Sequence, residues 1–303
     1  MTDTVIKTEG LSKRYGSVDA LIDLDLEVKK GEVLGYLGPN GAGKTTTIRL
    51  LLALARPSAG RAEIFGLDCQ RHAVEAHRYL TYVPGEANLW PALTGAETLR
   101  LLGRVHGQVD DAYRDELVER FELDVDTKVR AYSKGNRQKL MLIAAFMGRP
   151  DLLILDEPTA GLDPLMEQAF RHTVAEAKER GQTIFLSSHI LSEVEALCDR
   201  VAILRAGRLV EHGSLDEMRH LSSLLVEATF AGPVPDLSRV PGVRSLAADG
   251  HVARMEVAGP IDPLLKALAG SDVRELLSRE PSLEELFLSL YGDHHPVVAR
   301  DGG

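Results

Sequence analysis

The segment from Gly38 to Thr46 has the composition of a loop that binds phosphate. It reads Gly-Pro-Asn-Gly-Ala-Gly-Lys-Thr-Thr, with lysine and threonine directly after the last glycine. The glycines let the backbone curl tightly and turn its N–H groups inward, and together with the N-terminus of a following helix they form an anion site. The Lys44 ammonium can reach the β- and γ-phosphates of a nucleotide, and the Thr45 hydroxyl can ligate Mg²⁺. The predicted contacts are Gly38, Pro39, Asn40, Gly41, Ala42, Gly43, Lys44, Thr45 and Thr46.

Two carboxylates end an apolar run further along the chain. Leu152 to Leu155 is followed by Asp156 and Glu157. Beside a phosphate loop, a carboxylate at a strand end can hold Mg²⁺, which is the role we predict for Asp156 together with Thr45. Glu157 can polarise a water for attack on the γ-phosphate. In isolation the pair would also fit a solvated acidic turn, so the loop upstream decides between the two interpretations.

Two further segments could contact phosphate. His189 follows the apolar run Thr183 to Leu186, and there it can touch the γ-phosphate and orient the attacking water. Ser133 is a good N-cap for a helix running to Met147, and Gly135 allows a phosphate to approach the amides closely. A lone histidine or a capped helix start is more often structural, so these assignments depend on their placement around the acidic pair.

The elements that position these residues indicate an α/β fold. The runs Val33–Leu37, Leu152–Leu155 and Thr183–Ser187 are short and apolar or β-branched, which is typical of parallel strands covered on both faces. Helical stretches separate them, so we expect a doubly wound layer. Val5 to Glu9 and Leu24 to Val28 alternate polar and apolar residues and predict a small antiparallel sheet.

Two regions differ from this pattern. Residues 95–149 are nearly all helical in pattern and predict a helical insertion. After Leu221, strand-like runs are separated by Gly-Pro, Pro-Gly and Asp-Gly turns, and Ser282-Leu-Glu-Glu285 predicts a final helix from Leu283 to Tyr291. We therefore expect a domain of residues 1–221 and a small α+β domain of residues 222–303.

Bulk properties narrow the function classes. The formal charge of -10 argues against nonspecific binding to nucleic acid or to anionic lipid. The longest wholly apolar run, Leu140 to Met147, is well short of the roughly eighteen residues needed to cross a bilayer. We expect a cytosolic protein unless a partner holds it at a membrane.

In order and spacing, these motifs resemble the ATP-binding subunit of an ABC transporter. Gly38–Thr45 matches Walker A and Leu152–Glu157 matches Walker B. Ser133–Gln138 resembles the signature motif in the form common in drug-exporter ATPases. Asp163 lies in a segment similar to the D-loop, and His189 resembles the switch histidine. The end of the chain is similar to the accessory domain that follows ATPases of ABC-2-type exporters.

The resemblance implies a P-loop ATPase core that binds ATP and Mg²⁺ and works as a homodimer with a separate membrane permease, on the inner face of the cell membrane. Tyr15 would stack on adenine. ATP bound by one chain would be contacted in trans by the signature segment of the other; its contacts would be Ser133, Lys134, Gly135, Asn136 and Gln138. The transported substrate would be drug-like, antibiotic-like or another small amphipathic molecule, and no nucleic acid is expected as a partner.

One position departs from the family. After Tyr-Val-Pro the family usually has Gln, and here Gly85 and Glu86 follow Pro84. Glycine has no side chain to reach Mg²⁺ or water, so either Glu86 takes over that contact or the contact is absent.

Two alternatives are weighed against an exporter ATPase. A soluble ABC-type ATPase without a transporter typically carries tandem ATPase domains or long coiled coils, and neither is present here. A module that holds ATP without hydrolysing it would not need Glu157 and His189, and both are present.

Overall fold

The protein is described by a computed structural model covering residues 3–86, 88–107, 109–221 and 223–285. It forms two compact units, residues 1–213 and 214–303. The boundary observed after Gly213 falls before the one expected after Leu221. No helix in the described ranges is both long enough and apolar enough to pass through a bilayer.

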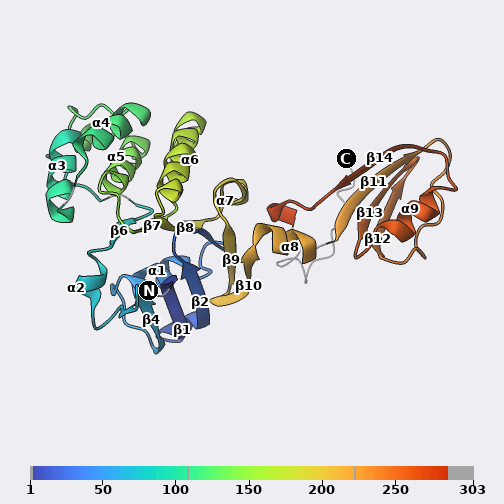
Figure 1. The fold of residues 1–303 in the computed structure, drawn as a ribbon, viewed down its shortest axis with the longest axis horizontal. Helices are drawn as coiled ribbons and strands as arrows, with labels where there is room; N and C mark the ends of the chain where they lie inside the picture. The colour runs from blue at the N-terminus through green and yellow to red at the C-terminus, as the bar shows by residue number, and fades with distance from the viewer. Residues whose placement is uncertain (1–2, 87, 108, 222, 286–303) are drawn as a thin grey trace. The chain divides into compact units, whose positions relative to one another are not determined.

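The six-stranded sheet forms the centre of the first unit (Figure 1). Its order is β10 (Arg208–Ser214), β9 (Arg200–Arg205), β3 (Val33–Leu37), β8 (Thr183–Ser188), β7 (Leu152–Asp156) and β6 (Leu80–Val83). The pairs β3–β8, β3–β9, β7–β8 and β6–β7 are parallel. Every residue of β3, β7 and β8 is buried, as expected for strands covered on both faces.

The predicted antiparallel sheet is present and larger than expected. Its order is β2 (Val18–Lys29), β1 (Thr4–Tyr15), β4 (Ala59–Ile64) and β5 (Leu67–Asp68). Ile6 lies opposite Val28, and Thr8 lies opposite Leu26. The β1–β2 ladder continues to the pair Tyr15–Val18, and this extension carries Tyr15 to the site described below. Sequence alternation had predicted only the regular parts of these two strands, because register shifts break the pattern between Thr8 and Arg14.

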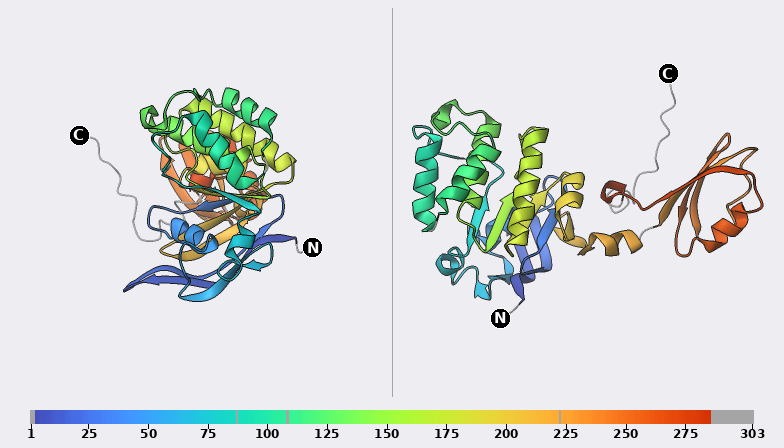
Figure 2. Two further views of the ribbon diagram at one scale, coloured as in Figure 1. Left: turned by 90° about the vertical axis from the view of Figure 1, so that its left-hand side faces the viewer. Right: turned by 45° about the horizontal axis from the view of Figure 1, so that its top comes forward.

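The helices of the first unit fall into two groups. Helices α1 (Lys44–Leu51), α6 (Pro164–Glu179) and α7 (Leu191–Leu197) contact the central sheet, and α2 (Ala73–Ala76) packs against β5 of the antiparallel sheet. The expected helical insertion contains α3 (Gly95–His106), α4 (Asp111–Arg120), the 3₁₀ turn η1 (Val129–Ala131) and α5 (Lys134–Phe146). Figures 1 and 2 show α3 to α6 gathered together, away from the antiparallel sheet.

The second unit is an α+β domain, as predicted. Its antiparallel sheet has the order β12 (Val243–Asp249), β13 (Val252–Val257), β11 (Leu224–Phe230) and β14 (Val273–Arg279), with helices α8 (Leu215–Leu221) and α9 (Asp262–Leu268). Its apolar core includes Phe230, Met255 and Leu264 and shares no residue with the core of the antiparallel sheet and α1.

The end of the second unit is described only in part. The capping box holds, since the Ser282 hydroxyl accepts from the Glu285 backbone N–H at 3.2 Å and Glu285 Oε2 accepts from the Ser282 N–H at 2.8 Å. Of the helix expected over Leu283–Tyr291, residues 286–291 lie outside the described residues.

Candidate functional site

The loop after β3 has the backbone that its glycines predicted. Gly41 and Gly43 have φ values of +81° and +114°, a region that favours glycine. A Cβ on Gly43 would meet Ala20 O at 2.6 Å, and one on Gly38 would meet Leu204 O at 2.7 Å. Lys44 begins α1, is 6% exposed, and its Nζ donates to Gly38 O at 2.6 Å. The loop therefore holds the Lys44 ammonium at the N-terminus of α1.

The predicted magnesium ligands lie together. Asp156 ends β7 and is 4% exposed, and its Oδ2 accepts from Thr45 Oγ1 at 3.2 Å. Its other oxygen accepts from Ser187 Oγ at 2.5 Å. A hydroxyl and a carboxylate are the oxygen donors that Mg²⁺ takes beside nucleotide phosphates, so this pair fits that ion.

Glu157 lies between the Lys44 ammonium and the His189 imidazole. Its Oε1 lies 3.4 Å from Lys44 Nζ, and its Oε2 lies 2.5 Å from His189 Nδ1. The backbone of Glu157 has φ of +51°, which is unusual for a residue with a side chain, and such conformations concentrate at functional sites. Its N–H donates to Ser187 O at 3.0 Å, which keeps the end of β7 beside β8. The fold thus brings two predicted residues, Lys44 and His189, to one carboxylate.

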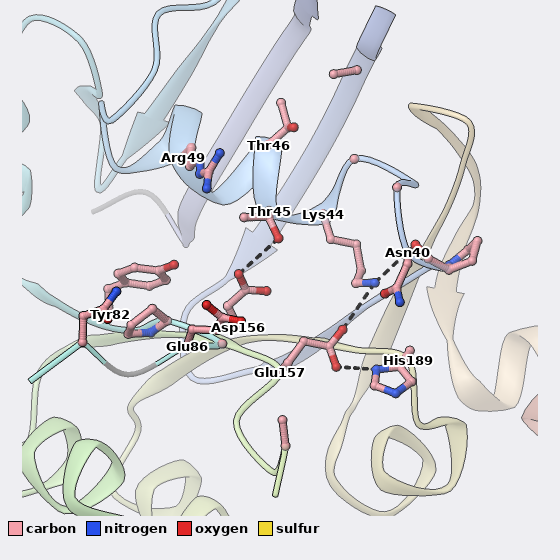
Figure 3. Close-up of a pocket in the computed structure, with 18 of the residues that line it drawn as sticks. Asn40, Lys44, Thr45, Thr46, Arg49, Tyr82, Glu86, Asp156, Glu157 and His189 are labelled. Carbon is pink, nitrogen blue, oxygen red and sulfur yellow. Dashed lines mark hydrogen bonds and ion pairs between the residues drawn. The ribbon is translucent and has the colours of Figure 1, made fainter. Parts of the chain in front are cut away.

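The side chains of Lys44, Thr45, Asp156, Glu157 and His189 line a single cavity of about 890 Å³ (Figure 3). The lining residues predicted from the sequence are Tyr15, Pro39, Asn40, Gly41, Gly43, Lys44, Thr45, Thr46, Glu86, Lys134, Asp156, Glu157 and His189. Gly38 and Ala42 lie outside this lining, and a Cβ on Gly38 would meet Ala42 Cβ at 2.8 Å. Tyr15 is 44% exposed at the end of β1, and Lys13 Nζ lies 4.8 Å from its ring centroid.

Two residues that no sequence motif indicates, Arg49 and Tyr82, line the same cavity. Arg49 is four residues after Thr45 in α1, so helical spacing alone places both on one face of the helix. Tyr82 lies in β6, where burial raises the pKa of its phenol to about 12. Figure 3 shows both side chains on the Thr45 side of the cavity.

The loop that lacks glutamine borders this cavity. A Cβ on Gly85 would lie 3.3 Å from Asp156 O, so the backbone of this loop passes close to the end of β7. Glu86 is exposed and lines the cavity. Glu86 therefore borders the cavity, and a magnesium contact from its carboxylate stays a prediction.

The signature segment, unlike the phosphate loop, lies mostly outside the cavity. Ser133 caps α5 by accepting from the Asn136 N–H at 3.1 Å and is itself exposed. A Cβ on Gly135 would meet Gly161 O at 2.7 Å, so glycine is needed for this close approach. Of the five signature residues, only Lys134 lines the described cavity.

Gln138 and Asp163 have local structural contacts. Gln138 is 2% exposed, and its Nε2 donates to Pro158 O at 2.9 Å. This placement turns the Gln138 amide towards its own chain, so we describe it as tying α5 to the segment after Glu157. Asp163 caps α6, with Oδ1 accepting from the N–H groups of Leu165 at 3.1 Å and Met166 at 3.0 Å.

The chain is similar in sequence to known ATP-binding proteins of transporters. Residues 21–160 match the family described as ABC transporter. The daunorubicin resistance ATP-binding protein DrrA3 of Streptomyces coeruleorubidus is 38% identical over 98% of this chain and 99% of its own length. The bacitracin transport ATP-binding protein BcrA of Bacillus licheniformis is 36% identical over 95% of this chain and 98% of its own length.

Solved structures resemble the first unit. An ATP-binding subunit of an ABC transporter is 35% identical, covers 71% of this chain and 92% of its own chain, and has a TM-score of 0.67. A bacterial Atm1-family ABC exporter with ATP bound is 26% identical, covers 72% of this chain and 40% of its own chain, and has a TM-score of 0.64.

Proposed function

The chain belongs to the family of ABC transporter ATP-binding proteins and is an exporter ATPase, and from that premise we propose how its residues divide the work. Glu157 polarises the attacking water, His189 orients it against the γ-phosphate, and Lys44 binds the β- and γ-phosphates. The observation that carries this assignment is the Glu157 carboxylate, which lies 3.4 Å from Lys44 Nζ on one oxygen and 2.5 Å from His189 Nδ1 on the other.

Thr45 and Asp156 would hold Mg²⁺, which when bound neutralises phosphate charge and polarises phosphoryl oxygens. The protein residues do the rest. The loop amides and the start of α1 bind the phosphates, and Tyr15 stacks on adenine from the end of β1. Ser187 donates to Asp156 Oδ1 and so keeps that carboxylate oriented.

We further propose a homodimer in which each ATP lies between two chains. The support is that Ser133 is exposed at the start of α5 and lies outside the cavity of its own chain. Its hydroxyl, the Gly135 and Asn136 amides and the start of α5 would contact the γ-phosphate bound by the partner chain. ATP then stabilises the closed dimer, and hydrolysis releases it.

The partner in the membrane is proposed to be a separate permease that docks beside the Glu86 loop. A groove of about 600 Å³ lies between α1, α2, β6 and α3. Its rim carries Leu54, Val74 and Val105, which are 65%, 78% and 75% exposed. Exposed apolar side chains around one groove are typical of a protein contact, and a cytoplasmic helix of the permease is the occupant we propose. This contact would hold the chain on the inner face of the membrane.

The substrate class is proposed from the relatives that match nearly the whole chain. They are named for daunorubicin resistance and bacitracin transport, which favours a drug-like or antibiotic-like amphipathic substrate. The same names favour an exporter over a soluble ATPase without a transporter.

The test is export itself. The chain and its permease are expressed in a drug-sensitive host, with Lys44→Ala as the matched inactive control. We expect a higher inhibitory concentration for at least one amphipathic antibiotic with the wild-type chain only. Equal resistance with Lys44→Ala would contradict an ATP-driven role.

A further inference from the structure

Glu193 is a buried carboxylate behind the loop that carries His189. It lies in the first turn of α7 and is only 7% exposed. Burial raises the pKa of its carboxyl, and hydrogen bonds to the Ser188 and Thr159 side chains offset this only in part. Burying a carboxylate costs free energy unless hydrogen bonds compensate for the lost water. The contacts of Glu193 should therefore show why a carboxylate is buried at this position.

The Ser188 hydroxyl links Glu193 to the backbone on both sides of His189. Ser188 Oγ donates to Glu193 Oε2 at 2.8 Å and accepts from the Ile190 N–H at 3.0 Å. These two bonds span His189 in the sequence and fix the chain before and after it. The His189 side chain is itself 55% exposed, so packing alone does not hold the imidazole in one rotamer.

The second oxygen of Glu193 faces the segment that follows Glu157. Glu193 Oε1 is buried, and within the described residues no group meets full hydrogen-bond geometry with it, although the Thr159 side chain lies close enough to lower the pKa of the carboxyl. It borders a cavity of about 30 Å³, lined by Thr159, Glu167, Arg171, Ile190, Ser192 and Glu193. This polar cavity has room for one water. Thr159 lies two residues after Glu157, so the cavity separates α7 from the loop that carries the proposed water-polarising carboxylate.

We propose that Glu193 is a positioning residue which, through Ser188, holds residues 188–190 so that the His189 imidazole stays against Glu157. The inference rests on the proposed roles of Glu157 and His189. Glu193 lies outside the lining of the nucleotide cavity, so it acts through His189 and does not touch ATP.

The test compares Glu193→Ala with Glu193→Gln. Alanine removes the acceptor for Ser188, whereas glutamine keeps one. We expect Glu193→Ala to lower kcat about ten- to hundredfold, the scale of a misplaced catalytic group, with KM for ATP within about twofold. Glu193→Gln should recover kcat to within about threefold of wild type.

Glu32→Ala is the matched control. Glu32 is also buried, at 8% exposed, and accepts from Arg200 Nη1 at 3.2 Å outside the nucleotide cavity. It should lower Tm without the selective loss of kcat. The proposal is overturned if Glu193→Ala lowers kcat no more than Glu32→Ala does, or if glutamine restores no more activity than alanine.

Two further variants keep the result interpretable. If Glu193→Ala does not fold, Ser188→Ala tests the same link, and its loss of kcat should not deepen when it is combined with Glu193→Gln. His189→Ala separates the two proposals. Wild-type turnover in His189→Ala would contradict the proposed role of His189, whereas a large loss there without a loss in Glu193→Ala would contradict only the positioning role.

Discussion

His189 Nδ1 and Glu157 Oε2 lie 2.5 Å apart, although the two residues are separated by 32 positions in the sequence. The other oxygen of the same carboxylate lies 3.4 Å from Lys44 Nζ. One side chain therefore orients two groups that would contact the γ-phosphate. The position of Glu157 at the end of β7, next to the end of β8, makes this possible because parallel strands end at the same edge of a sheet.

Glu86 provides a test of the loop that lacks glutamine. If its carboxylate supports the metal, Glu86→Ala should raise the Mg²⁺ concentration for half-maximal ATPase activity by roughly tenfold, the scale of a lost outer-sphere contact. Glu119→Ala is the control, because Glu119 is an exposed carboxylate in α4, away from the cavity. Adding Gly85→Gln to Glu86→Ala should return the Mg²⁺ concentration for half-maximal ATPase activity to the wild-type value. Unchanged Mg²⁺ dependence in Glu86→Ala would show that this loop contributes little to the metal site.

The shared site is tested by Ser133→Arg. Its bulk and charge should block the partner chain's nucleotide, so ATPase activity should fall by roughly a hundredfold, as when a preorganised donor is lost. ATP affinity of the dilute monomer should change by less than about twofold, measured by fluorescence with a nucleotide analogue. Ser245→Arg, an exposed serine in β12, is the control and should leave both quantities unchanged. Equal loss of monomer binding in Ser133→Arg would argue that the site belongs to one chain.

The chain ending at Gly213 tests the independence of the second unit. The apolar core around Phe230 shares no residue with that of the antiparallel sheet and α1, and the cavity lining ends at His189. We expect the shortened protein to fold by circular dichroism and to bind ATP within about threefold of the full chain. A folded product that does not bind ATP would mean that the second unit completes the nucleotide site.

Much of the site could be predicted because its residues stand at the ends of buried strands or, for Lys44, across a short glycine loop from one. Lys44, Asp156, Glu157 and His189 each follow or end an apolar run, and a parallel sheet brings such positions to one edge. Spacing alone cannot show which way a side chain turns, and Gln138 turns into its own chain.

Other features had no sequence signal of sufficient strength. The sequence of β14, Val-Arg-Glu-Leu-Leu-Ser-Arg, does not alternate apolar and polar residues, so it does not predict a strand. In the structure six of its seven residues are exposed. In the sequence, Glu193 is simply one of two acidic residues of α7. Its burial depends on how α7 packs against α6 and β3, which only tertiary structure sets.

The pH dependence of stability should depend on Glu193. Burial raises the pKa of this carboxyl in the folded protein, whereas in the unfolded chain the pKa is about 4.3. Between the two pKa values the folded state binds more protons, so this group makes the fold less stable as pH rises through that window. Glu193→Gln should therefore raise Tm more at pH 8 than at pH 4.5, measured by calorimetry. A gain in Tm that is larger at pH 4.5 would contradict the predicted loss of stability with rising pH.

The most direct test of the catalytic assignment is single-turnover ATP hydrolysis by Glu157→Gln. Glutamine keeps the shape but loses the charge that polarises water, so hydrolysis should fall by roughly a hundredfold or more. ATP should bind at least as tightly, because a negative charge beside the phosphates is gone, and the ATP-bound protein should run as a dimer in size-exclusion chromatography. Wild-type hydrolysis by Glu157→Gln would contradict the role given to this carboxylate.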